Sequence, residues 1–499
     1  MTTPVLSSAS GKPPFREMQA VWLVAAAVGL TLVVSLQAMQ GKWLIALVAG
    51  LFFCGVTVLT GRAERFLLGV LFFAIPFNAD FQLFPEVTEW HGTALPSGTP
   101  QMGLSAIDLV LGLMVVLWIS RLLAGKRRTV LRPAGVLFAA GLIGWAILSL
   151  WNAPSQKLGG FLLFNYLKAF LLFFYVANNV RTREDFLLIA KCLIAGMVFE
   201  SLFVFAQHAN GGNLGLEALG ERKVEKEVEM ASGTLFRPGG TLGHPNELGG
   251  YLAAVLPLSL ALCLAPFSRK QGSFWRVAAM GTGCAALVLS LSRSAWLAVA
   301  LVSVVLLFWT AARLKGRFNW GPILGLSTLG LIAAVLFAPM VIARWEEDDR
   351  GSTYSRIPQA EMAMGMIRKH PFLGVGLNNY GVASYLYETY VVDPKTRGRV
   401  YEHWGRIHNV FLQMASEIGL VGLGWFLLFI ASVVRYGWRR IRRCSDDQVR
   451  WILMGVLCGL LARLLHDATH TGDFSLIPQV WVYAGLLAAG AWMTGEKVR

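Results

Sequence analysis

Runs of apolar residues recur along the chain from end to end, separated by shorter polar segments. A helix needs roughly 18 or more apolar residues to span about 30 Å of hydrocarbon. The pattern therefore predicts about fourteen membrane-spanning helices. They fall at approximately residues 20–38, 42–60, 65–77, 105–123, 134–150, 158–178, 186–208, 246–266, 277–291, 295–312, 321–339, 409–434, 449–465 and 477–494. The third run is short, and we expect it to be tilted or partly re-entrant.

The composition also indicates a membrane protein. Hydrophobic residues make up 55% of the 499-residue chain and charged residues 15%, and the mean hydropathy is +0.56. A soluble domain of this length would need far more polar residues to cover its surface. The net charge is +15, but the basic residues cluster between apolar runs. This distribution argues against a nucleic-acid partner and for contact with membrane lipids.

The positions of lysine and arginine predict the orientation, because positive residues concentrate in cytoplasmic loops. Basic clusters occur at residues 62–65, 126–128, 181–183, 269–270, 313–317 and 439–443. The loops at 78–104 and 467–476 contain no lysine or arginine. The alternation predicts a multi-pass protein with both termini in the cytoplasm, whose first apolar run is a span and not a cleaved signal peptide.

We expect an all-α, polytopic integral membrane protein with one long periplasmic loop. Residues 1–339 would form membrane helices 1–11, including an outer loop at about 209–245, and residues 409–499 would form helices 12–14. Between them, residues 340–408 would form the periplasmic loop, which is large enough to act as a lid. Within it, the segment from 353 to 369 predicts a helix that ends at the following His-Pro pair.

Ionisable residues at the edges of apolar runs are functional candidates, because charge is costly there. Arg237 closes the first outer loop in a glycine-rich segment, and Arg293 lies in a tight turn between two predicted helices. His408 opens the twelfth predicted helix, and Glu417 lies deeper in it. A further ionisable cluster lies where the thirteenth predicted helix leaves the membrane: Arg463, His466, Asp467, His470 and Asp473. The predicted topology places all of these residues on the outer side.

Arginines that converge at a membrane surface suit a diphosphate. The guanidinium donates two parallel hydrogen bonds to phosphate oxygens and stays charged in most environments. Glycines around Arg237 would let the backbone approach an anion. A nearby histidine can accept a proton near neutral pH. The residues thus predict chemistry with a phosphate leaving group at the outer face.

Each candidate also has a structural explanation. Arg293 could pair with a carboxylate, and Glu417 could neutralise an arginine or bond to a neighbouring helix. His244, which precedes a proline, suits a turn. The segment from His466 to Asp473 has the composition of a metal site, or of a solvated loop.

Four segments in order carry a family resemblance. They are Arg237-Pro-Gly-Gly-Thr-Leu-Gly-His-Pro-Asn246, Leu291-Ser-Arg-Ser-Ala-Trp-Leu297, His370-Pro-Phe-Leu-Gly-Val-Gly-Leu-Asn378 and His408-Asn-Val-Phe-Leu-Gln with Glu417-Ile-Gly419. They resemble the bacterial O-antigen ligase and O-antigen polymerase family of polytopic membrane glycosyltransferases, over about residues 230–435. The Arg293 segment fits the family's arginine, three residues and a leucine, and the last segment fits its histidine, ten residues and a glycine.

The resemblance implies an enzyme of the bacterial inner membrane whose active site faces the periplasm. Its donor would be a glycan linked through diphosphate to undecaprenol, transferred to a hydroxyl with inversion and without a metal ion or other cofactor. Arg237 and Arg293, with Arg356 as a third candidate, would hold the diphosphate. His408 would deprotonate or orient the acceptor hydroxyl, and Glu417 would hold its imidazole. Further candidates for the site are His244, Arg463 and His466.

The acceptor stays open at this point. A ligase passes the glycan to lipid A-core, a polymerase passes it to the next lipid-linked repeat unit, and some family members glycosylate proteins. About fourteen spans favour a polymerase slightly. An inorganic-carbon-like transporter is the alternative from another class. It would show broken helices or midplane charges in repeated halves, whereas the candidate groups here gather at one face.

Overall fold

The computed structural model describes residues 63–77, 80–82, 89–90, 93–94, 102–125, 133–222, 227–230, 233–266, 273–314, 350–387, 390–392, 399–401, 406–470 and 472–489. The predicted spans at 20–38, 42–60 and 321–339 lie outside these residues. The chain divides into two compact units, one of residues 1–67 and 110–130 and the other of residues 68–109 and 131–499. Helices α3 (Ala63–Phe73) and α4 (Ala106–Leu123) each begin in one unit and end in the other. Within the first unit, Arg121 Nη1 lies 2.5 Å from Glu64 Oε2.

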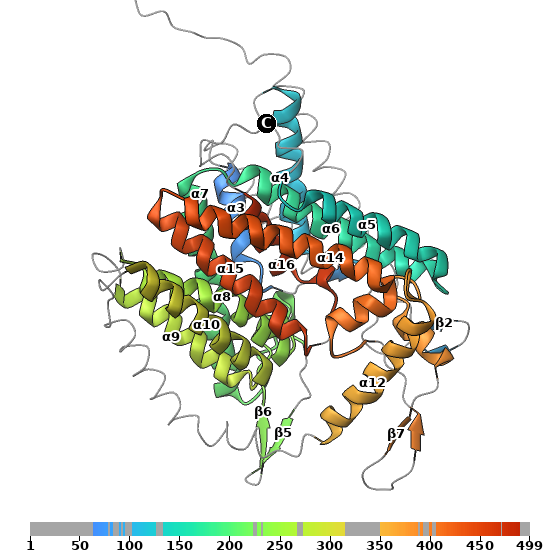
Figure 1. The fold of residues 1–499 in the computed structure, drawn as a ribbon. Helices are drawn as coiled ribbons and strands as arrows, with labels where there is room; N and C mark the ends of the chain where they lie inside the picture. Colours follow the sequence, from blue (N-terminus) through green and yellow to red (C-terminus); the bar gives the residue numbers. More distant parts are fainter. Residues whose placement is uncertain are drawn as a thin grey trace, which may run out of the picture. The chain divides into compact units, whose positions relative to one another are not determined.

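The second unit holds the other described helices (Figure 1). The α-helices are α5 (Val136–Ser149), α6 (Gln156–Asn179), α7 (Arg183–Asn210), α8 (Pro245–Leu264), α9 (Ser273–Leu289), α10 (Arg293–Leu314), α12 (Arg350–Lys369), α13 (Tyr380–Ala383), α14 (Val410–Arg443), α15 (Asp447–Asp467) and α16 (Pro478–Ala488). Short 3-10 turns are η1 (Leu150–Asn152), η2 (Glu217–Leu219), η3 (Gly240–Leu242), η5 (Ser384–Leu386) and η6 (Phe474–Leu476).

Four antiparallel two-stranded ribbons lie in the connecting segments. They pair β1 (Asp80–Gln82) with β4 (Gly103–Ser105), β2 (Glu89–Trp90) with β3 (Thr93–Ala94), β5 (Glu227–Met230) with β6 (Gly233–Phe236), and β7 (Tyr390–Val392) with β8 (Arg399–Tyr401). None of the ribbons in the described part of the chain is longer than four residues per strand, so the fold there is helical, as predicted.

Six of the described helices are long and apolar enough to cross a membrane: α6, α7, α8, α10, α14 and α15. Two shorter apolar helices correspond to α5 and α9. The apolar runs therefore predicted these helices, with ends that differ by up to about four residues except for α14, which continues to Arg443 beyond the predicted end at 434. The total of about fourteen spans stays a prediction. Outside the apolar runs, the helix predicted from 353 to 369 is present as α12 and begins three residues earlier.

Helices α8 and α15 pack closely at the centre of the second unit, and α10 lies against both (Figure 1). Gly455 and Gly459 of α15 face Leu258 and the Ala254 carbonyl of α8, where a β-carbon would collide with the neighbouring helix. Small residues four apart allow this close approach of two apolar helices. The Tyr483 hydroxyl of α16 donates to the Ala254 carbonyl at 3.1 Å. The packing fixes the ends of α8, α10 and α15 relative to one another.

Helix α14 is broken at Gly419, a feature that the apolar run did not predict. Gly419 has φ 73° and ψ 174°, a conformation that is essentially confined to glycine. The expected span from 409 to 434 is therefore two helical segments, and the second continues to Arg443. The first segment begins at Val410, after His408 and the capping residue Asn409, and ends at Ile418, so the break lies next to Glu417, and His408 lies at the other end of the segment.

Candidate functional site

The break in α14 is filled by the loop that follows α12. The Leu420 amide donates to the Pro371 carbonyl at 2.8 Å, and the Val375 amide donates to the Ser416 carbonyl at 2.9 Å. The Gly376 amide donates to the Glu417 carbonyl at 2.9 Å. These bonds satisfy backbone groups that a helix break otherwise leaves without partners. The loop and the two halves of α14 thus form one hydrogen-bonded unit.

The same loop is anchored on α5 and on the start of α6. The Trp145 indole N–H lies 3.1 Å from both the Phe372 and the Ile418 carbonyl oxygens, which flank the junction. Asn379 receives the Ser155 amide at 2.7 Å and donates back to the Ser155 carbonyl at 3.1 Å. Segments distant in sequence, namely α5, the start of α6 and both halves of α14, therefore hold the loop after α12 in place.

Glu417 anchors the motif from within α14. Its side chain is 2% exposed. Its carboxylate accepts the Asn378 amide at 3.0 Å, the Gln413 side-chain amide at 3.2 Å and the Tyr380 amide at 3.4 Å. These bonds join Glu417 to the segment after α12, and a role for Glu417 in holding the His408 imidazole stays a prediction. Glu417 is also linked to the His408 segment through Gln413, whose Oε1 accepts the Ile407 amide at 3.0 Å.

His408 is held by α12 instead. Gln359 Oε1 lies 2.9 Å from His408 Nδ1 and accepts the His408 backbone amide at 3.1 Å. The next residue, Asn409, caps α14 by accepting the Leu412 amide at 2.9 Å. The imidazole is therefore positioned by a neutral amide and lies at the N-terminus of a capped helix. The sequence offered no motif around Gln359 that would have identified this partner.

Arg237 lies at the turn between α9 and α10. Its side chain is 7% exposed, and one terminal nitrogen donates to the Ser290 carbonyl at 2.9 Å and to Asn246 Oδ1 at 3.3 Å. Its Nε has no hydrogen-bond partner within the described part of the chain. Burial and the charge of neighbouring Arg293 lower the pKa of Arg237 to about 10.

The segment that carries Arg237 is positioned by α7. Glu200 accepts the Thr241 amide at 2.8 Å and its hydroxyl at 2.7 Å, and Gln207 Oε1 accepts the Gly240 amide at 2.9 Å. All these groups are buried. The glycine-rich turn after Arg237 is thus fixed by polar side chains inside a largely apolar helix.

Of the three arginines predicted to bind diphosphate, Arg293 interacts electrostatically with each of the other two. Arg293 begins α10 and acts electrostatically on Arg237. It also interacts with Arg356 of α12, where burial lowers the pKa of the Arg356 guanidinium. The Nε of Arg356 has no hydrogen-bond partner among the described residues. Arg293 is therefore within electrostatic reach of both Arg237 and Arg356, which come from two other segments, and the binding of a diphosphate by these arginines stays a prediction.

Arg406, which the sequence did not single out, is a fourth cation near this region. It is half-buried, and burial lowers its pKa while Asp473, Glu417 and Glu247 act in the opposite direction. It lies two residues before His408. Both positively and negatively charged side chains thus lie within electrostatic reach of the segment before α14.

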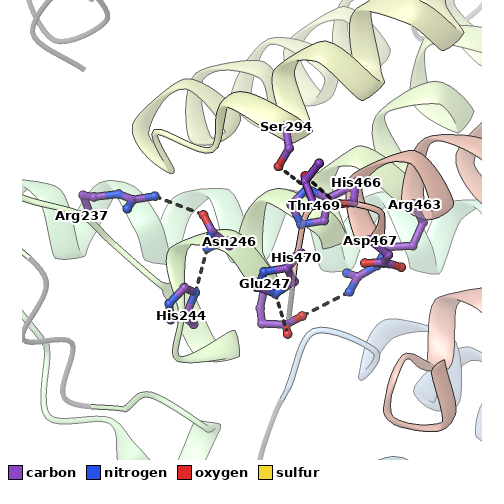
Figure 2. Close-up of polar contacts among 10 residues, drawn as sticks. All are labelled: Arg237, His244, Asn246, Glu247, Ser294, Arg463, His466, Asp467, Thr469 and His470. Atoms are coloured by element: carbon purple, nitrogen blue, oxygen red, sulfur yellow. Dashed lines mark hydrogen bonds and ion pairs between the residues drawn. The ribbon is translucent and has the colours of Figure 1, made fainter. Parts of the chain in front are cut away.

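The ionisable cluster at the end of α15 forms a buried network with α8 and α10 (Figure 2). Arg463 Nε lies 3.0 Å from Asp467 Oδ1, and Arg463 Nη2 lies 3.2 Å from Glu247 Oε2. Glu247 Oε1 also contacts His470 Nε2 at 3.0 Å. His466 Nδ1 lies 3.0 Å from the Ser294 hydroxyl, next to Arg293. The network thus connects α15 and the residues after it to Glu247 and Ser294. These two residues directly follow Asn246 and Arg293, which belong to the motif segments.

These contacts define what the additional candidates do in the fold. Arg463 is 1% exposed and is engaged by two carboxylates. His244 caps α8, because its Nδ1 accepts the Asn246 amide at 3.1 Å, which agrees with a turn-forming role. His466 binds Ser294. The three side chains lie beside the arginine group and support the segments that carry it.

Comparison with known proteins gives a family for part of the chain. Residues 277–427 match the family model described as O-antigen ligase. The matched segment contains Arg293, Arg356, His408 and Glu417, whereas Arg237 and the α15 network lie outside it. A search of curated proteins found no match. Residues 277–427 are thus similar to the O-antigen ligase family, and six of the described helices are long and apolar enough to cross a membrane.

Proposed function

We propose that this protein is an inverting, metal-independent glycosyltransferase that moves a glycan from undecaprenyl diphosphate to an acceptor hydroxyl at the periplasmic face. The observation that carries the proposal is the convergence of Arg237, Arg293 and Arg356. Holding three guanidinium groups close together and partly out of water is unfavourable. An anion with several oxygens would relieve this repulsion, and a diphosphate supplies them.

The arginines would act on the leaving group. As the bond between the anomeric carbon and the phosphate oxygen breaks, negative charge builds up on the diphosphate. Fixed cations in a site with little water stabilise that charge more than water does, because they need no reorganisation. Their combined charge supplies what a metal ion supplies in other transferases, so we propose that none is required.

His408 would act on the acceptor. The acceptor oxygen attacks the anomeric carbon from the side opposite the diphosphate, which inverts the configuration. A C–O bond forms to the acceptor, the bond to the phosphate oxygen breaks, and the hydroxyl proton passes to the imidazole. Undecaprenyl diphosphate leaves with the bonding electron pair. Its departure with the lipid anchor returns the protein to its starting state once the imidazole releases the proton.

The proposed topology limits the acceptor to molecules that present a hydroxyl at the periplasmic face. With both termini in the cytoplasm, the arginines and His408 face the periplasm, where a lipid-linked repeat unit or lipid A-core presents a hydroxyl. A protein acceptor is the third alternative. The segment 340–408, which contains α12 and the His370–Asn378 motif, would cover the site as a lid, and the family-like core would extend over residues 230–435.

Transport is the competing function, and the broken helix α14 is the feature that favours it, because transporters bind substrates at helix breaks. Here, however, the loop after α12 occupies the backbone groups of the break. Buried Glu417, beside the break, is engaged by Asn378, Gln413 and Tyr380. The polar groups at this break are hydrogen-bonded to a loop of the protein, so they are not available to bind a transported substrate. This supports an enzyme over a transporter.

The experiment that tests the proposal compares two arginines of the same helix. Arg293→Ala removes the cation at the start of α10, and Arg313→Ala removes one at its end, where it pairs with Asp447 at the half-exposed surface. Purified proteins in lipid vesicles receive an undecaprenyl-diphosphate oligosaccharide and an acceptor. We expect Arg293→Ala to lower kcat/KM by about 10²–10³-fold, with Arg313→Ala within about twofold of wild type. Equal turnover by Arg293→Ala and wild type would remove the diphosphate role.

A further inference from the structure

The hydrogen bonds of Gln359 determine the tautomer of His408. A backbone N–H is always a donor, so the Gln359 atom that lies 3.1 Å from the His408 amide nitrogen must be the carbonyl oxygen. This contact settles the orientation of the Gln359 amide, which is otherwise ambiguous in a side chain of this kind. The same oxygen lies 2.9 Å from His408 Nδ1. An oxygen without a proton can only accept, so Nδ1 must carry the hydrogen.

The proton on Nδ1 has a direct chemical consequence. In a neutral imidazole one ring nitrogen carries hydrogen and the other carries a lone pair. With hydrogen on Nδ1, the lone pair is on Nε2, at the tip of the side chain. Nε2 is then the atom that can take a proton from a hydroxyl group.

Gln359 is well suited to impose this tautomer, because it is held rigidly. Its side chain is 1% exposed, and its backbone carbonyl accepts the Tyr380 hydroxyl at 3.4 Å. The next two turns of α12 contribute Met362, Ala363 and Met366 to a buried cluster that also contains Ile407. The residue before His408 is thus packed against the helix that carries Gln359, so the distance between the two side chains is set by core packing.

The neutral character of the partner also matters. A carboxylate next to an imidazole stabilises the protonated imidazolium. A glutamine fixes the ring orientation without adding a negative charge that would favour the imidazolium. Gln359 therefore combines positioning with a charge state that suits a base.

We propose that Gln359 is a positioning residue that holds His408 in the Nδ1–H tautomer, so that Nε2 receives the proton of the acceptor hydroxyl; this rests on the proposed function. Loss of the correct tautomer would remove base catalysis, which contributes about 10²–10⁴-fold in enzymes. Donor binding by Arg237 and Arg293 would be unaffected, since they lie on other elements; Arg356 shares α12 with Gln359, so the test needs a replacement that keeps the side-chain volume and leaves this helix in place.

The test uses two replacements of similar size. Gln359→Met keeps the volume but has no oxygen, and Gln359→Glu keeps the oxygen and adds a charge. If Gln359 only fills space, Met is tolerated and a buried Glu is not. If it sets the tautomer, Met lowers kcat by about 10²-fold or more at every pH, with KM for the lipid-linked donor within about twofold. Glu then gives reduced activity near neutral pH that recovers towards wild type at alkaline pH, where the imidazole loses its extra proton.

Two controls separate the possible failures. Met362→Leu, a volume-conserving change in the same cluster, should leave kcat unchanged within about twofold, and His408→Ala should match Gln359→Met. Wild-type kcat in Gln359→Met together with an inactive His408→Ala overturns the tautomer proposal and leaves the proposed function standing. A fully active His408→Ala overturns both the base and its positioning. If Gln359→Met lowers Tm, Gln359→Glu decides alone, because inactivity at every pH from a folded variant contradicts the proposal.

Discussion

Replacement of Gly419 by alanine should separate the His370–Asn378 motif from α14. The backbone conformation at this position costs about 1–3 kcal/mol for a residue with a side chain. A β-carbon here would also collide with the Phe372 carbonyl, so the loop must move. That movement weakens the bonds of Leu420, Val375 and Gly376 across the break, each of which contributes about 1 kcal/mol. We expect a loss of unfolding free energy on the order of 3–5 kcal/mol.

Gly424→Ala is the matched control, because it lies in the same helix and a β-carbon there meets nothing within 4 Å. In a helical position alanine is favoured over glycine by up to about 1 kcal/mol. Thermal unfolding of the purified proteins in detergent should therefore show a lower Tm for Gly419→Ala and an equal or higher Tm for Gly424→Ala. Glycosyl transfer should fall only in the first, since the motif holds Ser416 and Glu417 at the end of the helical segment that begins after His408. Equal Tm and equal turnover for the two variants would refute the docking account.

Three further predictions concern buried polar groups. Arg463→Met leaves Asp467 buried without its cation and should lower the unfolding free energy by about 3–5 kcal/mol, with Arg463→Lys intermediate in Tm; a neutral effect would contradict the buried pairing. Asn379→Ala removes its bonds to Ser155 and Leu377 and should cost about 2–4 kcal/mol, measured as a lower Tm, and an unchanged Tm would contradict the anchoring of the motif on α6. Burial raises the pKa of Asp473, so its contribution to stability is greatest at acidic pH and is lost as pH rises through the raised value. The Tm of Asp473→Asn relative to wild type should therefore increase between about pH 4 and neutral pH, and a decrease would show that the sign is wrong.

The helices were predictable because the apolar runs and the charge clusters between them are strong signals. Helix α12 was predictable from its polar pattern and its His-Pro end, within three residues of the observed start. Arg237 and Arg293 were chosen because motif segments carry them, and Arg356 because it lies in the predicted helix of the outer loop; their joint role stays a prediction.

The break at Gly419 was not predictable from hydropathy, because glycine is common within membrane helices and the residues on both sides are apolar. The only sequence signal at this position was the family pattern of a histidine, ten residues and a glycine, which runs from His408 to Gly419. Gln359 was missed for a different reason. It lies 49 residues before His408, in a helix whose polar residues gave no sign of which one faces the imidazole.

The α15 network illustrates the same limit. Arg463 and Glu247 are 216 residues apart, and Arg463 was a candidate for binding a ligand because charge near a membrane is costly. The structure satisfies that cost internally, by pairing the charges across α8 and α15. Sequence alone shows which charges need partners but not whether the partner is protein or substrate.

The central claim is that the protein transfers a glycan from undecaprenyl diphosphate with His408 as base. The most direct measurement follows purified wild type and His408→Ala in vesicles with an undecaprenyl-diphosphate oligosaccharide, alone and with lipid A-core, and detects both the glycan product and the released undecaprenyl diphosphate. The account predicts that both appear with wild type, as a lengthened glycan or as a glycan on lipid A-core, and that both are lost in the variant. No release from folded wild-type protein with either acceptor or with a protein acceptor would contradict it, and so would full turnover by His408→Ala.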